Sequence, residues 1–216
     1  MILNLHSIAY PVTALGPGRR IVLWVTGCHK RCEGCISPEM LSPQSGKPVQ
    51  VKSLIARLER VELALDGITI SGGEPFDQKE ALGALLSDLH ARFPNWNTLV
   101  YSGYTLEEIE SIVDPKRVLQ RFVDVLIDGP FQKDIPSIHA LAGSGNQRTH
   151  FLTERARGLK PLIEDDVKGR LELGLGIGDL KMLVGVVPRA ASEIVQQGLF
   201  PTRHVQSGKD PSVLPC

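Results

Sequence analysis

Three cysteines lie close together in the amino-terminal part of the chain, at Cys28, Cys32 and Cys35. Their spacing, C-x3-C-x2-C, lets one short loop bring three thiolates to a single inorganic group, and thiolates are the usual ligands of iron–sulfur clusters. Three thiolates leave one iron of a [4Fe–4S] cube without a protein ligand. An open coordination position is typical of a catalytic metal site. The spacing therefore favours a [4Fe–4S] cluster with one open iron.

Two other interpretations stay open on the cysteines alone. A structural zinc ion takes four ligands, so it would need His29 or His6 beside the three thiolates. The other interpretation is that the cysteines bind no metal. The one remaining cysteine, Cys216, lies far from the triad, and we therefore expect no second cluster.

The cysteine segment directly follows an apolar, β-branched run, Ile21–Val25, which reads as a buried strand. Further strands are expected at 67–70, 97–101 and 123–127, and helices at 51–63, 78–93 and 106–113. Strands that alternate with helices predict an α/β fold built on a parallel sheet. The motifs whose residues could carry out chemistry follow the strands. This placement is expected for parallel sheets, whose sites gather at the carboxyl ends of the strands.

Bulk composition is that of a globular protein, with 42% hydrophobic and 22% charged residues among 216. The formal net charge is +0, so there is no overall attraction to nucleic acid or to an anionic membrane. We find neither a secretory signal nor an apolar run of membrane-spanning length. We therefore expect a cytoplasmic protein with no nucleic-acid or membrane partner.

The chain changes character after residue 152, and we predict two parts, a core over 1–152 and a carboxyl-terminal extension over 153–216. Within the extension we expect a late strand at 182–187, a short helix at 190–197 and a loose tail. The glycine-rich segment 174–179 reads as a turn, because no Lys-Ser or Lys-Thr pair follows it to form a phosphate loop.

Six motifs in order resemble the radical S-adenosylmethionine (radical SAM) superfamily, and in particular the activating enzymes of anaerobic ribonucleotide reductase. They span roughly residues 5 to 150 and read WVTGC, CEGC with PE after it, ISGGEP, VYSGYT, DVLIDGPF and GSGNQR. The resemblance implies a partial parallel (βα) barrel in which Cys28, Cys32 and Cys35 hold a [4Fe–4S] cluster. It also implies that the cluster reductively cleaves S-adenosylmethionine to give a 5′-deoxyadenosyl radical.

The resemblance also assigns cofactor-binding positions. Glycines allow close backbone approach to a ligand, and Glu74 would accept hydrogen bonds from the methionyl ammonium. Ser102 would touch the ribose or carboxylate, Asp128 would hold the ribose or support the site, and Arg148 would pair with a carboxylate. The predicted cofactor-binding residues are Gly72, Gly73, Glu74, Ser102, Asp128 and Arg148.

The implied partner is a glycyl radical enzyme, with anaerobic ribonucleotide reductase as the leading case, and the implied electron donor is a flavodoxin or ferredoxin. Two alternatives remain open at this point. The same radical chemistry would serve an enzyme that modifies a peptide or a small metabolite directly. A non-catalytic metal-binding module would need only the three cysteines. Residues 153–216 extend beyond the matching motifs, and substrate choice commonly lies in such appendages.

Overall fold

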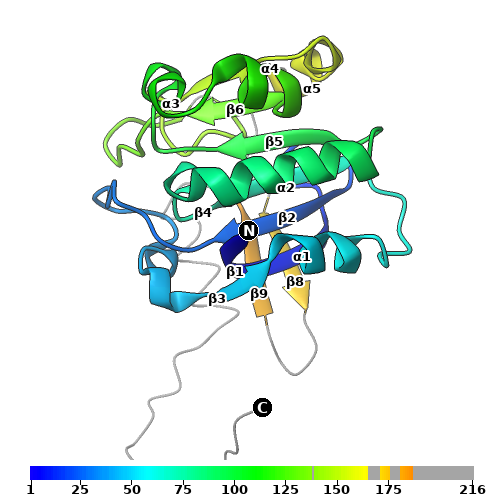
Figure 1. The fold of residues 1–216 in the computed structure, drawn as a ribbon. Helices are drawn as coiled ribbons and strands as arrows, with labels where there is room; N and C mark the ends of the chain where they lie inside the picture. The colour runs from blue at the N-terminus through cyan, green and yellow to red at the C-terminus, as the bar shows by residue number, and fades with distance from the viewer. Residues whose placement is uncertain (138, 165–170, 176–180, 187–216) are drawn as a thin grey trace, which may run out of the picture.

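A computed structural model describes residues 1–137, 139–164, 171–175 and 181–186 (Figure 1). Within these ranges, seven strands form one sheet, in the order β3-β1-β2-β4-β5-β6-β7, and two more form a separate hairpin. The strands of the main sheet are β1 (Ile2–Val12), β2 (Arg20–Val25), β3 (Lys47–Gln50), β4 (Gly67–Gly72), β5 (Asn97–Tyr101), β6 (Val125–Asp128) and β7 (Arg148–Phe151). The hairpin consists of β8 (Leu171–Leu175) and β9 (Lys181–Gly185).

The connections between the strands contain helices of three types. The α-helices are α1 (Val51–Leu58), α2 (Lys79–Arg92), α3 (Leu106–Ile112), α4 (Gln120–Phe122) and α5 (Lys160–Glu164). Short 3-10 helices cover Pro38–Met40, Pro43–Ser45, Pro75–Gln78 and Arg155–Gly158, and a π-helical turn covers Pro115–Leu119.

The main sheet is mixed. Its centre, β2-β4-β5-β6, is parallel, whereas β1, β3 and β7 run antiparallel to their neighbours. The prediction of an α/β fold is confirmed. The sheet is not wholly parallel, since β1 and β7 pair antiparallel with the parallel centre. Neither strand was apparent in the sequence, because β1 alternates only weakly and β7 is polar. The partial parallel barrel stays a prediction.

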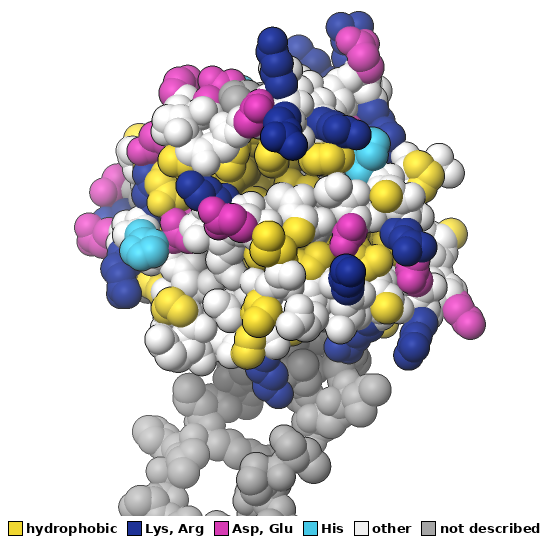
Figure 2. Space-filling model, viewed as in Figure 1, with side chains coloured by type: hydrophobic (Ala, Val, Ile, Leu, Met, Phe, Trp, Pro, Cys, Tyr) yellow, Lys and Arg dark blue, Asp and Glu magenta, His cyan; other side chains and the backbone are white. Residues whose placement is uncertain are grey.

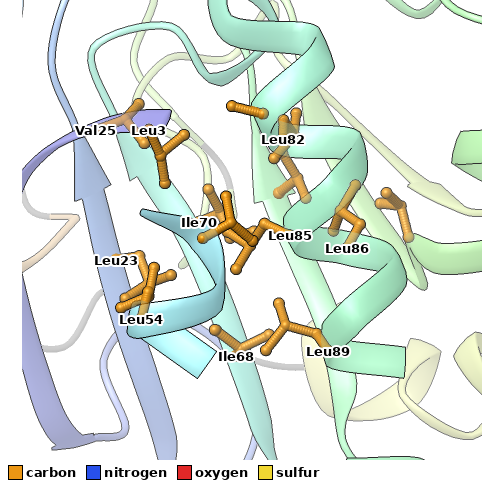
Figure 3. Packing of buried hydrophobic residues seen from close by; sticks show 14 of the residues in the cluster. Leu3, Leu23, Val25, Leu54, Ile68, Ile70, Leu82, Leu85, Leu86 and Leu89 are labelled. Carbon is orange, nitrogen blue, oxygen red and sulfur yellow. The ribbon is translucent and has the colours of Figure 1, made fainter. Parts of the chain in front are cut away.

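Helices α1 and α2 cover one face of the sheet (Figure 1). Apolar positions recur along α2 with the period of one helical face, and they meet the alternate residues of β2 and β4 (Figure 3). The fully buried contacts include Leu23 of β2, Ile68 and Ile70 of β4, and Leu82, Leu85, Leu86 and Leu89 of α2. This core holds the parallel strands at fixed spacing and so fixes where their carboxyl ends lie.

The hairpin of β8 and β9 packs on the opposite face of the sheet, behind β1 and β2 in Figure 1. Val184 of β9 is 3% exposed and packs in one cluster with Trp24 of β2. The carboxylate of Glu172 in β8 accepts hydrogen bonds from the backbone N–H of Thr13 (2.9 Å) and of Ala14 (3.2 Å), and from the Thr13 hydroxyl. The described part of the extension therefore covers the face that the helices leave open.

Most predicted elements are present, with shifted ends. The strand predicted at 67–70 continues to Gly72, the strand predicted at 123–127 begins at Val125, and the helix predicted at 51–63 ends at Leu58. The late strand predicted at 182–187 is β9, at Lys181–Gly185. The helix predicted at 190–197, the tail, Cys216 and most of the 174–179 turn lie outside the described residues. The division at residue 152 stays a prediction.

Acidic and basic side chains alternate over the helix-bearing face, without a large area of one sign (Figure 2). This distribution agrees with the balanced formal charge of the chain. Among the described residues, no helix is long and apolar enough to cross a bilayer.

Candidate functional site

The cysteine loop leaves the carboxyl end of β2 and returns on itself before β3. Its base is closed by two backbone hydrogen bonds, from Gly27 N–H to the Met40 carbonyl (2.9 Å) and from Cys28 N–H to the Leu41 carbonyl (3.1 Å). Within the loop, the Cys35 N–H donates to the Cys32 carbonyl at 3.2 Å. The three cysteines are therefore carried by one closed loop at the edge of the sheet.

The three thiols are partly buried and near enough to influence one another's charge. Burial raises the pKa of the Cys28 thiol, and burial together with the neighbouring Cys28 and Cys32 raises the pKa of Cys35. A tetrahedral zinc ion, with Zn–S bonds of about 2.3 Å, would hold these sulfur atoms close together. In the described ranges, no three Cys, His, Asp or Glu side chains are arranged to hold a single ion.

Neither histidine of the zinc interpretation joins the thiols. The Nδ1 atom of His29 lies 2.7 Å from Asp77 Oδ2, and Nδ1 of His6 lies 3.0 Å from the Ser7 hydroxyl. Each of these contacts engages Nδ1 alone, so it does not occupy the Nε2 atom of either ring.

Gly72 and Gly73 lie where β4 meets the cysteine loop. The Gly73 N–H donates to the Val25 carbonyl (2.8 Å), and the Glu74 N–H donates to the Gly27 carbonyl (2.7 Å). A Cβ atom on Gly72 would lie 2.4 Å from the Val25 carbonyl oxygen, and one on Gly73 would lie 2.3 Å from that of Gly27. The glycines therefore let two stretches of the chain's own backbone meet, and their predicted approach to a cofactor stays a prediction.

Glu74 is fully buried and connects β4 to the end of β5. Its carboxylate accepts hydrogen bonds from the Ser102 hydroxyl (2.8 Å), the Gly103 N–H (2.7 Å) and the Phe76 N–H (3.0 Å). Ser102, itself buried, donates its backbone N–H to the Ile127 carbonyl of β6 at 2.9 Å. The predicted pair Glu74 and Ser102 is thus brought together, and the two residues contact each other.

The burial of Glu74 has a consequence for stability. Burial raises the pKa of its carboxyl from 4.5 to about 7, despite the three hydrogen bonds. The folded chain therefore binds more protons than the unfolded chain between these two values, and the free energy of unfolding falls as the pH rises through this range.

We therefore expect the wild type to lose stability, relative to Glu74→Gln, when the pH is raised from about 5 to about 8. Urea unfolding of both metal-free proteins at the two pH values measures the difference, and the other titrating groups cancel in the comparison. If the difference in unfolding free energy between wild type and Glu74→Gln is the same at both pH values, the raised pKa of Glu74 is contradicted.

Asp128 and Arg148 pair with each other across β6 and β7. Arg148 Nη2 lies 2.6 Å from Asp128 Oδ2, and Arg148 also bonds both carboxylate oxygens of Glu107, at 3.0 and 2.7 Å. The Leu106 N–H donates to Asp128 at 2.5 Å, at the start of α3. Burial favours the neutral acid, but the bonds from Arg148 and Leu106 and the charge of His150 hold the pKa of Asp128 below its usual 3.8.

These contacts bear on the two sequence interpretations of Asp128. The residue is fully buried and its carboxylate is occupied by groups of the chain. The geometry favours support of the site over direct contact with a ribose. Arg148 pairs with two carboxylates of the chain itself, those of Asp128 and Glu107, and its predicted contact with the cofactor stays a prediction.

The glycine-rich loop at 143–148 is anchored to the residues after β6. Gln147 Nε2 donates to the Gly129 carbonyl (2.9 Å), and Asn146 Nδ2 donates to the Pro130 carbonyl (2.8 Å). Asn146 Oδ1 is buried, yet it has no hydrogen-bond partner among the described residues. A buried acceptor without a protein partner is costly in a native structure and is commonly satisfied by water, an ion or a ligand.

A cavity of about 220 Å³ lies elsewhere, between the end of α2 and the segment 120–124. Its lining includes Leu89, Phe93, Trp96 and Phe122, at the amino ends of the strands. The cavity therefore lies at the opposite edge of the sheet from the cysteine loop.

Several residues around the loop were not singled out from the sequence. Asp77, in the 3-10 helix after Glu74, bonds to both His29 and Tyr104, and Lys30 pairs with Glu108 of α3 at 2.9 Å. The only available signal was proximity in sequence to the SGGEP and SGYT motifs. Trp24 and Phe76 are core residues, at 7% and 2% exposure.

Comparison with known proteins agrees with this geometry. The family described as the 4Fe-4S single cluster domain matches residues 14–150. The anaerobic ribonucleoside-triphosphate reductase-activating protein of Enterobacteria phage T4 is 35% identical over 138 residues, which cover 62% of this chain and 84% of the phage protein.

Bacterial proteins of the same name are also similar. The one from Salmonella typhi is 32% identical over 150 residues, covering 66% of this chain and 96% of that protein. The one from Escherichia coli (strain K12) is 32% identical over 162 residues, covering 69% and 99%. The chain thus belongs to the 4Fe-4S single cluster domain family, together with the anaerobic ribonucleoside-triphosphate reductase-activating proteins.

Proposed function

We propose that this chain is a radical SAM activating enzyme that generates a glycyl radical on a partner enzyme, with anaerobic ribonucleotide reductase as the leading partner. In this proposal Cys28, Cys32 and Cys35 hold a [4Fe–4S] cluster, and S-adenosylmethionine binds beside it. The observation that carries the proposal is the placement of the three-cysteine loop at the end of β2, joined directly to the Gly72–Glu74 turn of the neighbouring parallel strand.

When bound, the cluster and S-adenosylmethionine would together supply one-electron chemistry that ends in hydrogen-atom abstraction from the partner, and Cys28, Cys32 and Cys35 would hold the cluster. The residues of this chain orient the cofactor and exclude water. Glu74 and Ser102 fix the ends of β4 and β5 beneath the loop, and Asp128 with Arg148 fixes the end of β6. The unpartnered Oδ1 of Asn146 would accept a hydrogen bond from the cofactor's ammonium or ribose hydroxyl.

The partner follows from the relatives, which are named as activating proteins of anaerobic ribonucleoside-triphosphate reductase. A flavodoxin or ferredoxin is the proposed electron donor, since the reaction consumes one electron from outside the chain. We also propose a cytoplasmic location, where thiols stay reduced. The named activity of the relatives favours this function over direct modification of a peptide or metabolite.

Production of 5′-deoxyadenosine tests the chemistry. Wild-type protein, reconstituted anaerobically and given S-adenosylmethionine and dithionite, is expected to form it, whereas Cys35→Ala is expected to form none, because one cluster ligand is lost. Added anaerobic reductase should then show a glycyl radical by electron paramagnetic resonance. If the wild type holds a full cluster yet forms no 5′-deoxyadenosine, the cluster is structural or sensory and the proposal fails.

A further inference from the structure

The segment between Cys28 and Cys32 is held by contacts with a different part of the chain. The backbone N–H of His29 donates to Asp77 Oδ2 at 3.0 Å, and its ring Nδ1 lies 2.7 Å from the same oxygen. The His29 side chain is 86% exposed, whereas that of Asp77 is 10% exposed. The buried carboxylate is therefore the fixed partner, and the exposed loop is what it holds.

Asp77 is itself held from a third segment. The Tyr104 hydroxyl donates to Asp77 Oδ1 at 2.8 Å, so the two carboxylate oxygens serve two different elements. The ammonium of Lys30 lies 4.2 Å from the centre of the Tyr104 ring and bonds the Glu108 carboxylate at 2.9 and 3.0 Å. Such a cation over an aromatic face is an attractive contact. Two consecutive loop residues are thus tied to the turn after Glu74 and to the start of α3.

The loop needs this support more between its first two cysteines than between its last two. Arg31 has a backbone φ of 45°, in the left-handed region that side-chain-bearing residues adopt at a conformational cost. The Cys32–Cys35 turn, in contrast, carries its own backbone hydrogen bond. Cluster binding requires thiolates at fixed positions, and ordering them beforehand removes part of the entropic cost of binding.

We propose that Asp77 is a positioning residue for the iron–sulfur cluster, holding His29–Arg31 in the shape that directs Cys28 and Cys32 to one cube, with Tyr104 fixing Asp77 in turn. This inference rests on the cluster of the proposed function and adds two residues outside its ligand set. Groups that orient metal ligands typically change metal affinity by about 10–100-fold when they are replaced.

The test is the rate at which anaerobically reconstituted protein loses its iron to a chelator, followed by the visible absorbance of the cluster. We expect Asp77→Ala to lose iron about 10–100-fold faster than wild type. Asp77→Asn, which keeps one acceptor oxygen, should fall between them. Asp88→Asn on α2, a carboxylate at a distance from the loop, is the matched control and should behave as wild type.

Tyr104→Phe removes a single hydroxyl and gives a milder variant that tests the same connection. Its effect should be smaller than that of Asp77→Ala, and the double variant should lose iron no faster than Asp77→Ala alone, because Tyr104 acts through Asp77. Thermal unfolding and the electron paramagnetic resonance spectrum of the reduced cluster separate positioning from folding. We expect a changed spectrum with an unchanged unfolding midpoint in Tyr104→Phe.

Iron loss at the wild-type rate in both Asp77→Ala and Tyr104→Phe would overturn the inference while leaving the proposed function intact. A wild type that takes up no cluster under these conditions would overturn the proposed function, and the inference with it. The two failures are therefore distinguishable in one experiment.

Discussion

Replacing Arg20 with methionine is expected to lower the free energy of unfolding by about 1–3 kcal/mol, the cost of leaving a buried hydrogen-bond acceptor without its donor. Arg20 is fully buried at the start of β2, and burial lowers its pKa to about 10. Its guanidinium donates to Thr69 Oγ1 (2.7 Å), Asn97 Oδ1 (2.6 Å) and the Ile68 carbonyl (2.6 Å). Methionine fills much of the volume but leaves these acceptors without their donors.

The measurement is anaerobic urea unfolding of the wild type and Arg20→Met, followed by circular dichroism. Arg57→Met on the exposed side of α1 is the matched control, and it should change stability by less than about 0.5 kcal/mol. A loss of less than about 1 kcal/mol in Arg20→Met would show that the acceptors find other partners or water.

Substituting alanine for Gly73 is expected to weaken both the fold and cluster binding. The new Cβ would lie 2.3 Å from the Gly27 carbonyl oxygen and 2.9 Å from its carbon, and both atoms belong to the backbone of the cysteine loop. Relief requires β4 and the loop to separate, which breaks the hydrogen bonds from Gly73 and Glu74. Overpacking of this kind costs about 1–3 kcal/mol.

Gly83→Ala on α2 is the control for Gly73→Ala, because its Cβ would meet nothing within 4 Å. Alanine is expected to stabilise a helix interior by about 0.5–1 kcal/mol over glycine. The two variants should therefore change stability in opposite directions. Iron content after reconstitution should fall only in Gly73→Ala, and equal iron content in both would contradict the proposed role of the close backbone contact.

Features that depend on local patterns could be predicted from the sequence. The C-x3-C-x2-C spacing identified the loop, and the apolar run before it identified β2 as the strand that carries it. The helix predicted at 78–93 is α2, because a helical face repeats within a few residues and so shows in a short stretch of sequence. The motifs at the ends of β4, β5 and β6 meet because adjacent parallel strands end at one edge.

Features that depend on distant partners could not be predicted in this way. Asp77 contacts His29 across 48 positions of sequence, and Arg20 contacts Asn97 across 77. No spacing rule relates such pairs, and a single aspartate after a turn is common in any chain. The antiparallel strands β1 and β7 were missed for another reason, since their side chains are too mixed in polarity to show a clear alternation.

Gly72 and Gly73 show a third limit on what the sequence can predict. Their lack of side chains correctly indicated a close approach, but the sequence did not reveal what approaches. In the structure the neighbouring atoms are the carbonyls of Val25 and Gly27. A glycine pair in a motif therefore predicts crowding more securely than it predicts the identity of the crowding group.

The hairpin of β8 and β9 occupies a surface of the sheet that a segment of another protein would otherwise be able to bind. Its contacts at Glu172 and Val184 lie beyond the family match, which ends at residue 150. A tethered segment occupies its site at an effective concentration on the order of millimolar. Any segment of another protein that reached the same face would have to displace an occupant that never diffuses away.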